Sequence, residues 1–179
     1  MKIDRRVRYT KMVLKNSFVQ LLNEKSFDKI TVKELCERAD VNRGTFYVHY
    51  KDQQDLLHQI QKDFLCQAKQ LLFSCSNSIE YYEYIKENKD LINCLYHHHL
   101  SMDFGVEFSG FVREYLEMEL NPMGIEDKGE NSVLYDFLEG ALIGTIMAWI
   151  KNDCALDATQ LSKNLKKLYD GTLANYLKK

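Results

Sequence analysis

Residues 43–50, with the sequence RGTFYVHY, combine cationic, hydroxyl and aromatic side chains at helical spacing. The potential donors to a polyanion in and directly after this segment are Arg43, Thr45, Tyr47, His49 and Lys51. Phe46 and Tyr50 are four residues apart, so on a helix they share one face and can anchor it to a core. Gly44 costs about 1 kcal/mol of helix propensity, which indicates close approach of the backbone to another molecule. The pattern predicts a helix that meets DNA phosphates; a solvated helix face is the alternative.

A second cluster of reactive side chains consists of Cys94, His97, His98 and His99. On a helix Cys94 shares a face with His97 or His98, and a thiolate with imidazoles suits zinc or copper. No fourth ligand follows at a clear spacing, and a polar helix end with histidines that complement the helix dipole explains the same residues. We therefore predict no metal and no cofactor, and a metal or redox sensor stays an alternative function.

The sequence around the polar segment predicts a helix-turn-helix that would position it. Apolar residues at helical spacing, Leu14, Phe18, Leu21 and Leu22, predict a first helix over 7–24. Thr31 begins a capping box, which predicts a second helix over 31–39. Asn42 caps a third helix over 43–50. Two short helices joined by a turn of three or four residues form a helix-turn-helix.

The rest of the chain also follows helical periods. Asp52 caps a fourth helix over 52–73. Further helices are predicted at 79–88, 90–99, 101–120, 131–152 and 158–177. Gly and Pro together make only 9 of 179 residues, so tight turns are few. We predict an all-α fold with a helix-turn-helix head over residues 1–51. Residues 52–179 then supply a linker helix and a larger helical body.

The charge distribution separates the same two parts. Residues 1–51 carry 12 Lys and Arg and 6 Asp and Glu, whereas the other 128 residues carry 12 and 20. A basic head on an acidic body favours a polyanion as the partner of the head. The N-terminus lacks the apolar segment of a signal peptide, and the longest apolar run, 141–150, is half a membrane span. We expect a cytoplasmic protein with no membrane partner.

The segment TVKELCERADVNRGTFYVHYKD at residues 31–52, followed by QQDLL, resembles the TetR family of bacterial transcriptional regulators. The family pattern is a Thr-capped helix, an Ala-Gly-Val-type turn, Gly-Thr-(Leu/Phe)-Tyr-x-His-(Phe/Tyr) and a capped Leu-Leu helix. Residues 84–91 and 137–144 resemble a C-terminal variant common in Gram-positive members. Two positions depart from the pattern: Asp40 replaces the usual turn Gly, and Gln53 stands where a phosphate-binding Lys is frequent.

The resemblance implies a role for each matching residue of the head. Thr31 and Lys33 would touch the DNA backbone or a groove edge. Arg43, Gly44 and Thr45 would enter the major groove, where Arg43 is the candidate for a bidentate guanine contact. The phosphate contacts would come from Tyr47, His49 and Lys51.

The resemblance also implies a ligand pocket in the body, for which we select Tyr84, Phe108, Phe111 and Trp149; the alternative is that these aromatic residues are core. The mixed polarity of the aromatic residues predicts an uncharged or mildly polar organic ligand. Residues 131–177 should form a homodimer interface, with Gly140 and Gly144 allowing close helix approach. The apolar stripes are Leu138, Leu142, Ile146, Trp149, Leu161, Leu165, Leu168, Leu173 and Leu177, which could instead pack within one chain.

The chain contains no Gly-x-Ser-x-Gly, phosphate-loop or dinucleotide motif, so we predict that it is not an enzyme. The predicted function is a ligand-responsive regulator, a repressor that binds a palindromic operator as a dimer. A helical co-activator that acts mainly through a protein partner is the other possibility.

Overall fold

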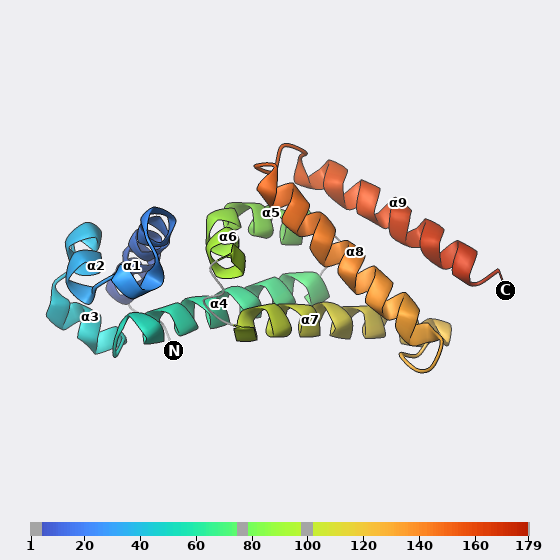
Figure 1. The fold of residues 1–179 in the computed structure, drawn as a ribbon, viewed down its shortest axis with the longest axis horizontal. Helices are drawn as coiled ribbons and strands as arrows, with labels where there is room; N and C mark the ends of the chain where they lie inside the picture. Colours follow the sequence, from blue (N-terminus) through green and yellow to red (C-terminus); the bar gives the residue numbers. More distant parts are fainter. Residues whose placement is uncertain (1–4, 75–78, 98–101, 179) are drawn as a thin grey trace. The chain divides into compact units, whose positions relative to one another are not determined.

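The computed structural model of the chain describes residues 5–74, 79–97 and 102–178. These residues form helices and turns, and no strand occurs among them, which confirms the predicted all-α class (Figure 1). In chain order the helices are α1 (Arg5–Glu24), the 3-10 turn η1 (Phe27–Lys29), α2 (Val32–Ala39), α3 (Arg43–His49), α4 (Gln53–Ser74), α5 (Ile79–Glu87), α6 (Lys89–His97), α7 (Met102–Leu120), the 3-10 turn η2 (Asn121–Met123), α8 (Asn131–Lys151) and α9 (Ala158–Tyr176).

The chain divides into two compact units, which we call the head unit and the body unit. The head unit is Met1–Cys66 with Asp90–Ser101, and the body unit is Gln67–Lys89 with Met102–Lys179. The division differs from the predicted border after residue 51, because it falls inside α4 and places α6 with the head.

Burial explains where the division falls. The first half of α4 buries Leu56, Leu57 and Phe64, each at most 1% exposed. These residues therefore belong to a packed core and not to a solvated linker. In α6 the Cys94 thiol donates to Asn23 Oδ1 of α1 at 3.1 Å, so this helix is also part of the head unit.

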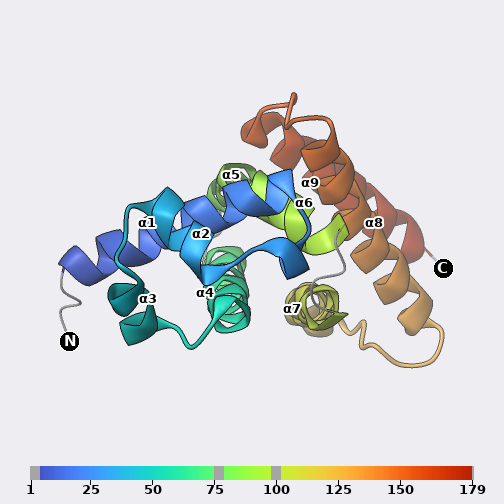
Figure 2. The same cartoon turned by 60° about the vertical axis from the view of Figure 1, so that its left-hand side comes forward.

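The head unit is a small helical core in which α1 packs on α2 and α2 on α3 (Figure 2). The predicted stripe of α1 is buried, since Leu14, Phe18, Leu21 and Leu22 are all at most 1% exposed. The guanidinium of Arg38 binds both carboxylate oxygens of Glu24, and Lys25 pairs with Glu34. These two ion pairs link α1 and Lys25, the residue that follows it, to α2. The orientation of α1 relative to α2 is therefore stabilised by apolar packing and by these ion pairs.

Side-chain caps begin α2, α4 and α9, and those of α2 and α4 lie where the sequence predicts them. The Glu34 amide donates to Thr31 Oγ1 at 3.2 Å, and the Asp55 amide donates to Asp52 Oδ1 at 2.8 Å. At α9 the Gln160 amide donates to Asp157 Oδ1 at 2.9 Å. Each cap satisfies a backbone donor that has no partner within its helix.

The body unit has its own apolar core around α7, α8 and α9. Its buried members are Leu116, Leu120, Ile125, Leu134, Tyr135, Leu138 and Leu173. The Tyr135 hydroxyl donates to the Ile125 carbonyl at 2.9 Å, which fixes the segment between α7 and α8. Arg113 lies over the Tyr135 ring and binds three carboxylates, those of Asp127, Asp136 and Glu139.

Helix α8 is long and apolar enough to cross a membrane by length and composition, which the uninterrupted run at 141–150 did not indicate. Only 33% of its apolar window is buried within the chain. A core or interface helix of a protein outside membranes meets the same test, so composition alone assigns α8 to neither environment.

Candidate nucleic-acid interface and body cavity

Helix α3 presents its polar residues outward and its aromatic anchors inward. Phe46 is 0% exposed and Tyr50 is 5% exposed, whereas the neighbouring Tyr47 is 52% exposed. Arg43, Thr45 and Lys51 are also exposed. The core thus holds α3 by two side chains and leaves the rest of its surface for another molecule.

The cationic side chains of this surface form no strong ion pairs with carboxylates of the described chain. Arg43 and Lys51 form no ion pair within the described chain. Lys33 lies 3.8 Å from Glu37, but both side chains are well exposed, and such pairs hold their partners weakly. A phosphate can therefore be bound without first breaking a strong contact.

Two predicted residues already take part in helix caps. Thr31 Oγ1 accepts from the Glu34 amide, which leaves the Thr31 O–H free to donate to a phosphate oxygen. The Gly44 amide donates to Asn42 Oδ1 at 2.7 Å, and a Cβ on Gly44 would lie 3.2 Å from that oxygen. Gly44 therefore fits tightly beside its own cap, a local reason for glycine that the sequence analysis missed.

His49 is the least exposed of the predicted phosphate ligands. Its side chain is half-buried and its ring centroid lies 6.3 Å from that of Tyr50. The structure therefore brings Thr31, Lys33 and the α3 residues together in one unit, with His49 at the edge of the core.

Of the cluster Cys94, His97, His98 and His99, only the side chain of Cys94 is described. His98 and His99 lie outside the described residues, as does the side chain of His97. Burial raises the pKa of the Cys94 thiol to about 11, so the metal-free thiol is protonated at neutral pH. Among the described residues no three His, Cys, Asp or Glu side chains are close enough to hold a metal ion.

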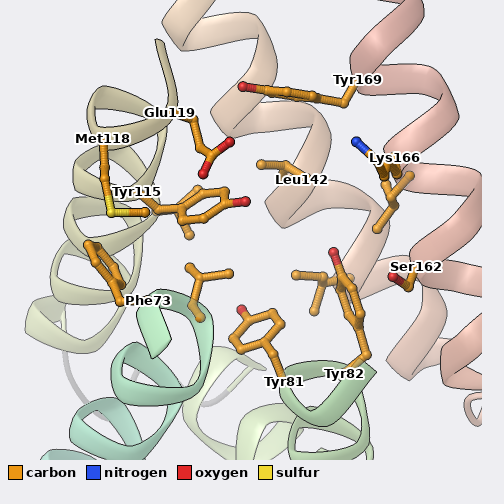
Figure 3. A pocket seen from close by; sticks show the side chains of 14 residues that line it. Phe73, Tyr81, Tyr82, Tyr115, Met118, Glu119, Leu142, Ser162, Lys166 and Tyr169 are labelled. Atoms are coloured by element: carbon orange, nitrogen blue, oxygen red, sulfur yellow. The ribbon is translucent and has the colours of Figure 1, made fainter. Parts of the chain in front are cut away.

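The body unit contains a cavity of about 410 Å³ lined by residues of α4, α5, α7, α8 and α9 (Figure 3). Its lining is mostly apolar and aromatic, with four tyrosines, Tyr81, Tyr82, Tyr115 and Tyr169. A volume of this size is within the range of small-molecule sites. The cavity belongs to one unit, so its geometry does not depend on how the two units are placed.

The four residues predicted to line a ligand pocket, Tyr84, Phe108, Phe111 and Trp149, do not line this cavity. Phe108 and Phe111 are buried against each other, with ring centroids 4.9 Å apart. Trp149 is 5% exposed, and its Nε1 donates to the Leu156 carbonyl at 2.8 Å. Tyr84 is half-buried in α5 and is not among the residues that line the cavity. These residues stabilise the body core and the segment after α8.

Residue type and helical spacing do not separate the tyrosines that line the cavity from Tyr84, which was predicted to line a pocket. Tyr81 and Tyr82 precede Tyr84 on the same short helix, and a helical period alone does not distinguish which tyrosine reaches a cavity.

An exposed apolar face runs along α8 in the body unit. Val133 is 72% exposed and Phe137 is 59% exposed, and the small residues Ala141, Gly144 and Ala148 continue the face. On α9 Leu168 is 66% exposed. A Cβ placed on Gly144 would have no neighbour within 4 Å, so a second helix can approach closely here.

The predicted dimer stripes are largely buried within one chain. The residues at most 7% exposed are Leu138, Ile146, Trp149, Leu161, Leu165 and Leu173. Only Leu168 and Leu177 of the predicted stripe residues are exposed. The apolar face of α8 that another chain can contact is therefore the exposed one that contains Val133 and Phe137.

Comparisons with known proteins agree with the helix-turn-helix geometry. Residues 19–60 match the family described as bacterial regulatory proteins, tetR family, and residues 76–171 match the transcriptional regulator C-terminal region of that family. The chain belongs to the TetR family of DNA-binding transcriptional regulators. The uncharacterized HTH-type transcriptional regulator YxbF of Bacillus subtilis is 37% identical over 57 residues, which are 31% of this chain and 15% of that protein.

Solved structures share the fold over nearly the whole chain. A TetR transcriptional regulator from Streptococcus agalactiae superposes with a TM-score of 0.62 at 24% identity, covering 92% of this chain and 96% of that one. The dihydroxyacetone kinase operon activator DhaS gives 0.62 at 15% identity, with 91% and 95% covered. The fatty acid degradation regulator FadR from Bacillus halodurans gives 0.60 at 15% identity, with 94% and 96% covered. At these identities the likeness shows the fold.

Proposed function

We propose that the protein is a ligand-responsive repressor that works in the cytoplasm and binds a palindromic operator as a homodimer. The observation that carries the proposal is the donor surface of α3, where Arg43, Thr45 and Tyr47 are exposed while Phe46 is fully buried. An arginine on such a helix can donate to both acceptors of a guanine, and hydroxyl groups can hold phosphates. Repression follows if the bound dimer covers a promoter.

The exposed apolar face of α8 and α9 supports the dimer. Phe137 and Leu168 are large apolar side chains that water would otherwise surround, and Gly144 provides room for a second helix. A two-fold dimer would carry two copies of α3, which suits a palindromic site.

Ligand response is supported by the path of α4. Its first half belongs to the head unit, and Leu72 and Phe73 near its end line the body cavity. A ligand that contacts these residues touches the helix that continues into the head. The response requires a ligand that prefers one arrangement of α4, because equal affinity for two states shifts neither.

An activator that works through a protein partner is the second candidate, and the structural neighbour DhaS is named as an operon activator. Duplex binding separates the candidates. Purified protein would be used to select duplexes from a random library, and the enriched sequence would then be titrated by fluorescence anisotropy against a scrambled duplex. The repressor proposal predicts a palindromic motif and protection of a promoter; failure to enrich any motif would contradict it.

The dimer has its own test by sedimentation velocity. Phe137→Glu should shift the protein to monomer at micromolar concentration, since a carboxylate would be buried at the interface. Val106→Glu is the matched control, because Val106 is 72% exposed on α7 and lies off the exposed apolar face. Equal sedimentation of both variants would exclude this face as the interface.

A further inference from the structure

The polar groups of the body cavity are unevenly satisfied. The hydroxyl oxygens of Tyr81 and Tyr169 are buried and have no hydrogen-bond partner among the described residues. Buried hydroxyl groups normally have partners, so two orphaned ones in the lining of one cavity, one from α5 and one from α9, point to a molecule that the cavity binds. Burial, followed in Tyr169 by the charge of Glu119, raises the pKa of both phenols, so both stay neutral.

The charges around the cavity favour a cation. Glu119 lines the cavity, and its carboxylate forms no ion pair within the described chain. Figure 3 shows this carboxylate on the wall of α7, in the space between Tyr115 and Tyr169. Lys166 lines the opposite wall, and its ammonium lies 3.1 Å from the carboxylate of Asp170, an exposed residue beside the cavity. The charges of Glu119, Lys166 and Asp170 therefore sum to one negative charge at this site.

The aromatic lining has the same preference. The cavity wall includes five rings: Phe73, Tyr81, Tyr82, Tyr115 and Tyr169. The face of an aromatic ring is electronegative and attracts a cation within about 6 Å. Hydroxyl oxygens of neutral phenols also accept hydrogen bonds from an ammonium group. Leu72, Val112 and Ile146 provide an apolar surface for the rest of the ligand.

We propose that this cavity binds an organic cation with an apolar body, such as a protonated or quaternary amine, whose charged centre lies between Glu119 and the tyrosine rings. The proposal rests on the ligand-responsive function above and names the ligand class. It replaces the uncharged ligand expected from aromatic composition, because the sequence does not reveal that Glu119 lines the cavity while Asp170 offsets the charge of Lys166. A carboxylate ligand would instead face Glu119 and compete with Asp170 for Lys166.

Three probes of similar size distinguish the charge classes. They are benzyltrimethylammonium, its neutral carbon isostere neopentylbenzene, and the anion 4-phenylbutyrate. The only tryptophan, Trp149, packs edge-on against Tyr82 with ring centroids 6.5 Å apart, so its fluorescence can report binding without DNA. We expect the cation to bind at least about tenfold more tightly than either other probe.

Glu119→Gln should weaken binding of the cation about fivefold and leave the neutral probe unchanged. Glu117→Gln is the matched control, because it removes the same charge from α7 at a position that does not line the cavity. Circular dichroism would verify that both variants are folded. Equal affinity for cation and neutral isostere, tighter binding of the anion, or equal loss in both variants would overturn the proposal.

The DNA experiment is separate from this one. If the probe series fails while the enriched duplex still binds, the cation site is wrong and DNA recognition stands. If the cation binds with the predicted Glu119 dependence but leaves duplex affinity unchanged, the cation site is supported and ligand-responsive regulation is contradicted.

Discussion

The two candidate sites of this protein are built in opposite ways. On α3 the polar side chains lie outside a core that is complete without them, since Phe46 and Tyr50 alone anchor the helix. In the body cavity the Tyr81 hydroxyl lies among core residues, buried and with no hydrogen-bond partner in the described part of the chain. Substitutions on the α3 surface can therefore change specificity without loss of stability. In the body cavity, a polar group that binds a ligand lowers the stability of the ligand-free protein.

The largest expected effect is at the α3 anchor. Phe46→Ala should destabilise the head by about 3–5 kcal/mol, because it removes a fully buried aromatic side chain. The adjacent Tyr47→Ala should change stability by less than about 0.5 kcal/mol and still weaken DNA binding. Urea unfolding and duplex titration of both variants test this; similar losses of stability would mean that the exposed face also belongs to the core.

The next effect is in the cavity and has the opposite sign. Tyr81→Phe should stabilise the ligand-free protein by about 1 kcal/mol, because it removes a buried hydroxyl that has no hydrogen-bond partner among the described residues. Thermal unfolding should then show a Tm increase of about 2–4 °C. The same variant should bind a protonated amine less tightly than the parent, because it lacks the hydroxyl oxygen that accepts the N–H of the amine. A lower Tm would indicate that the hydroxyl is satisfied without ligand.

A smaller effect is expected at the turn of the helix-turn-helix. Asp40 has φ 51° and ψ 45°, a left-handed conformation that costs energy in residues other than glycine. Asp40→Gly should stabilise the protein by about 0.5 kcal/mol. Asp40→Asn removes the same charge but keeps a side chain, so it separates backbone strain from electrostatics. If both variants gain equally in Tm, charge is the cause.

The smallest effect concerns the pH dependence of the body. The hydrogen bond from Arg113 lowers the pKa of Asp127, so this carboxylate stabilises the folded state fully above its unfolded pKa of about 3.9. The contribution is lost as the pH falls from there through the folded pKa. Tm should therefore differ between the parent and Arg113→Gln near pH 7, and the difference should shrink below about pH 4. A constant difference would exclude the ion pair as its source.

The sequence predicted the head in more detail than the body because the determinants of the head are local. Thr31 and Asp52 cap helices through contacts that lie three residues along the chain. Such contacts follow from residue type and spacing. The short turn η1 was missed, since three residues provide no period.

The cavity and the dimer face depend on contacts between distant segments, which residue spacing does not encode. Periodicity marks Leu138 and Ile146 as apolar, yet it does not indicate that they pack within one chain while Phe137 stays exposed. Likewise Tyr84 and Tyr81 are equivalent by residue type. Only packing against α7 and α9 distinguishes the one that lines the cavity.

The central claim is that the α3 surface reads DNA, and one titration tests it most directly. Parent, Arg43→Ala and Lys51→Ala would each be titrated against the enriched duplex and a scrambled duplex at two salt concentrations. Arg43→Ala should reduce discrimination by about 1–3 kcal/mol. Lys51→Ala should weaken both duplexes and lower the salt slope by about one unit. If the curves of all three proteins coincide on both duplexes, α3 is a solvated helix face and the account is contradicted.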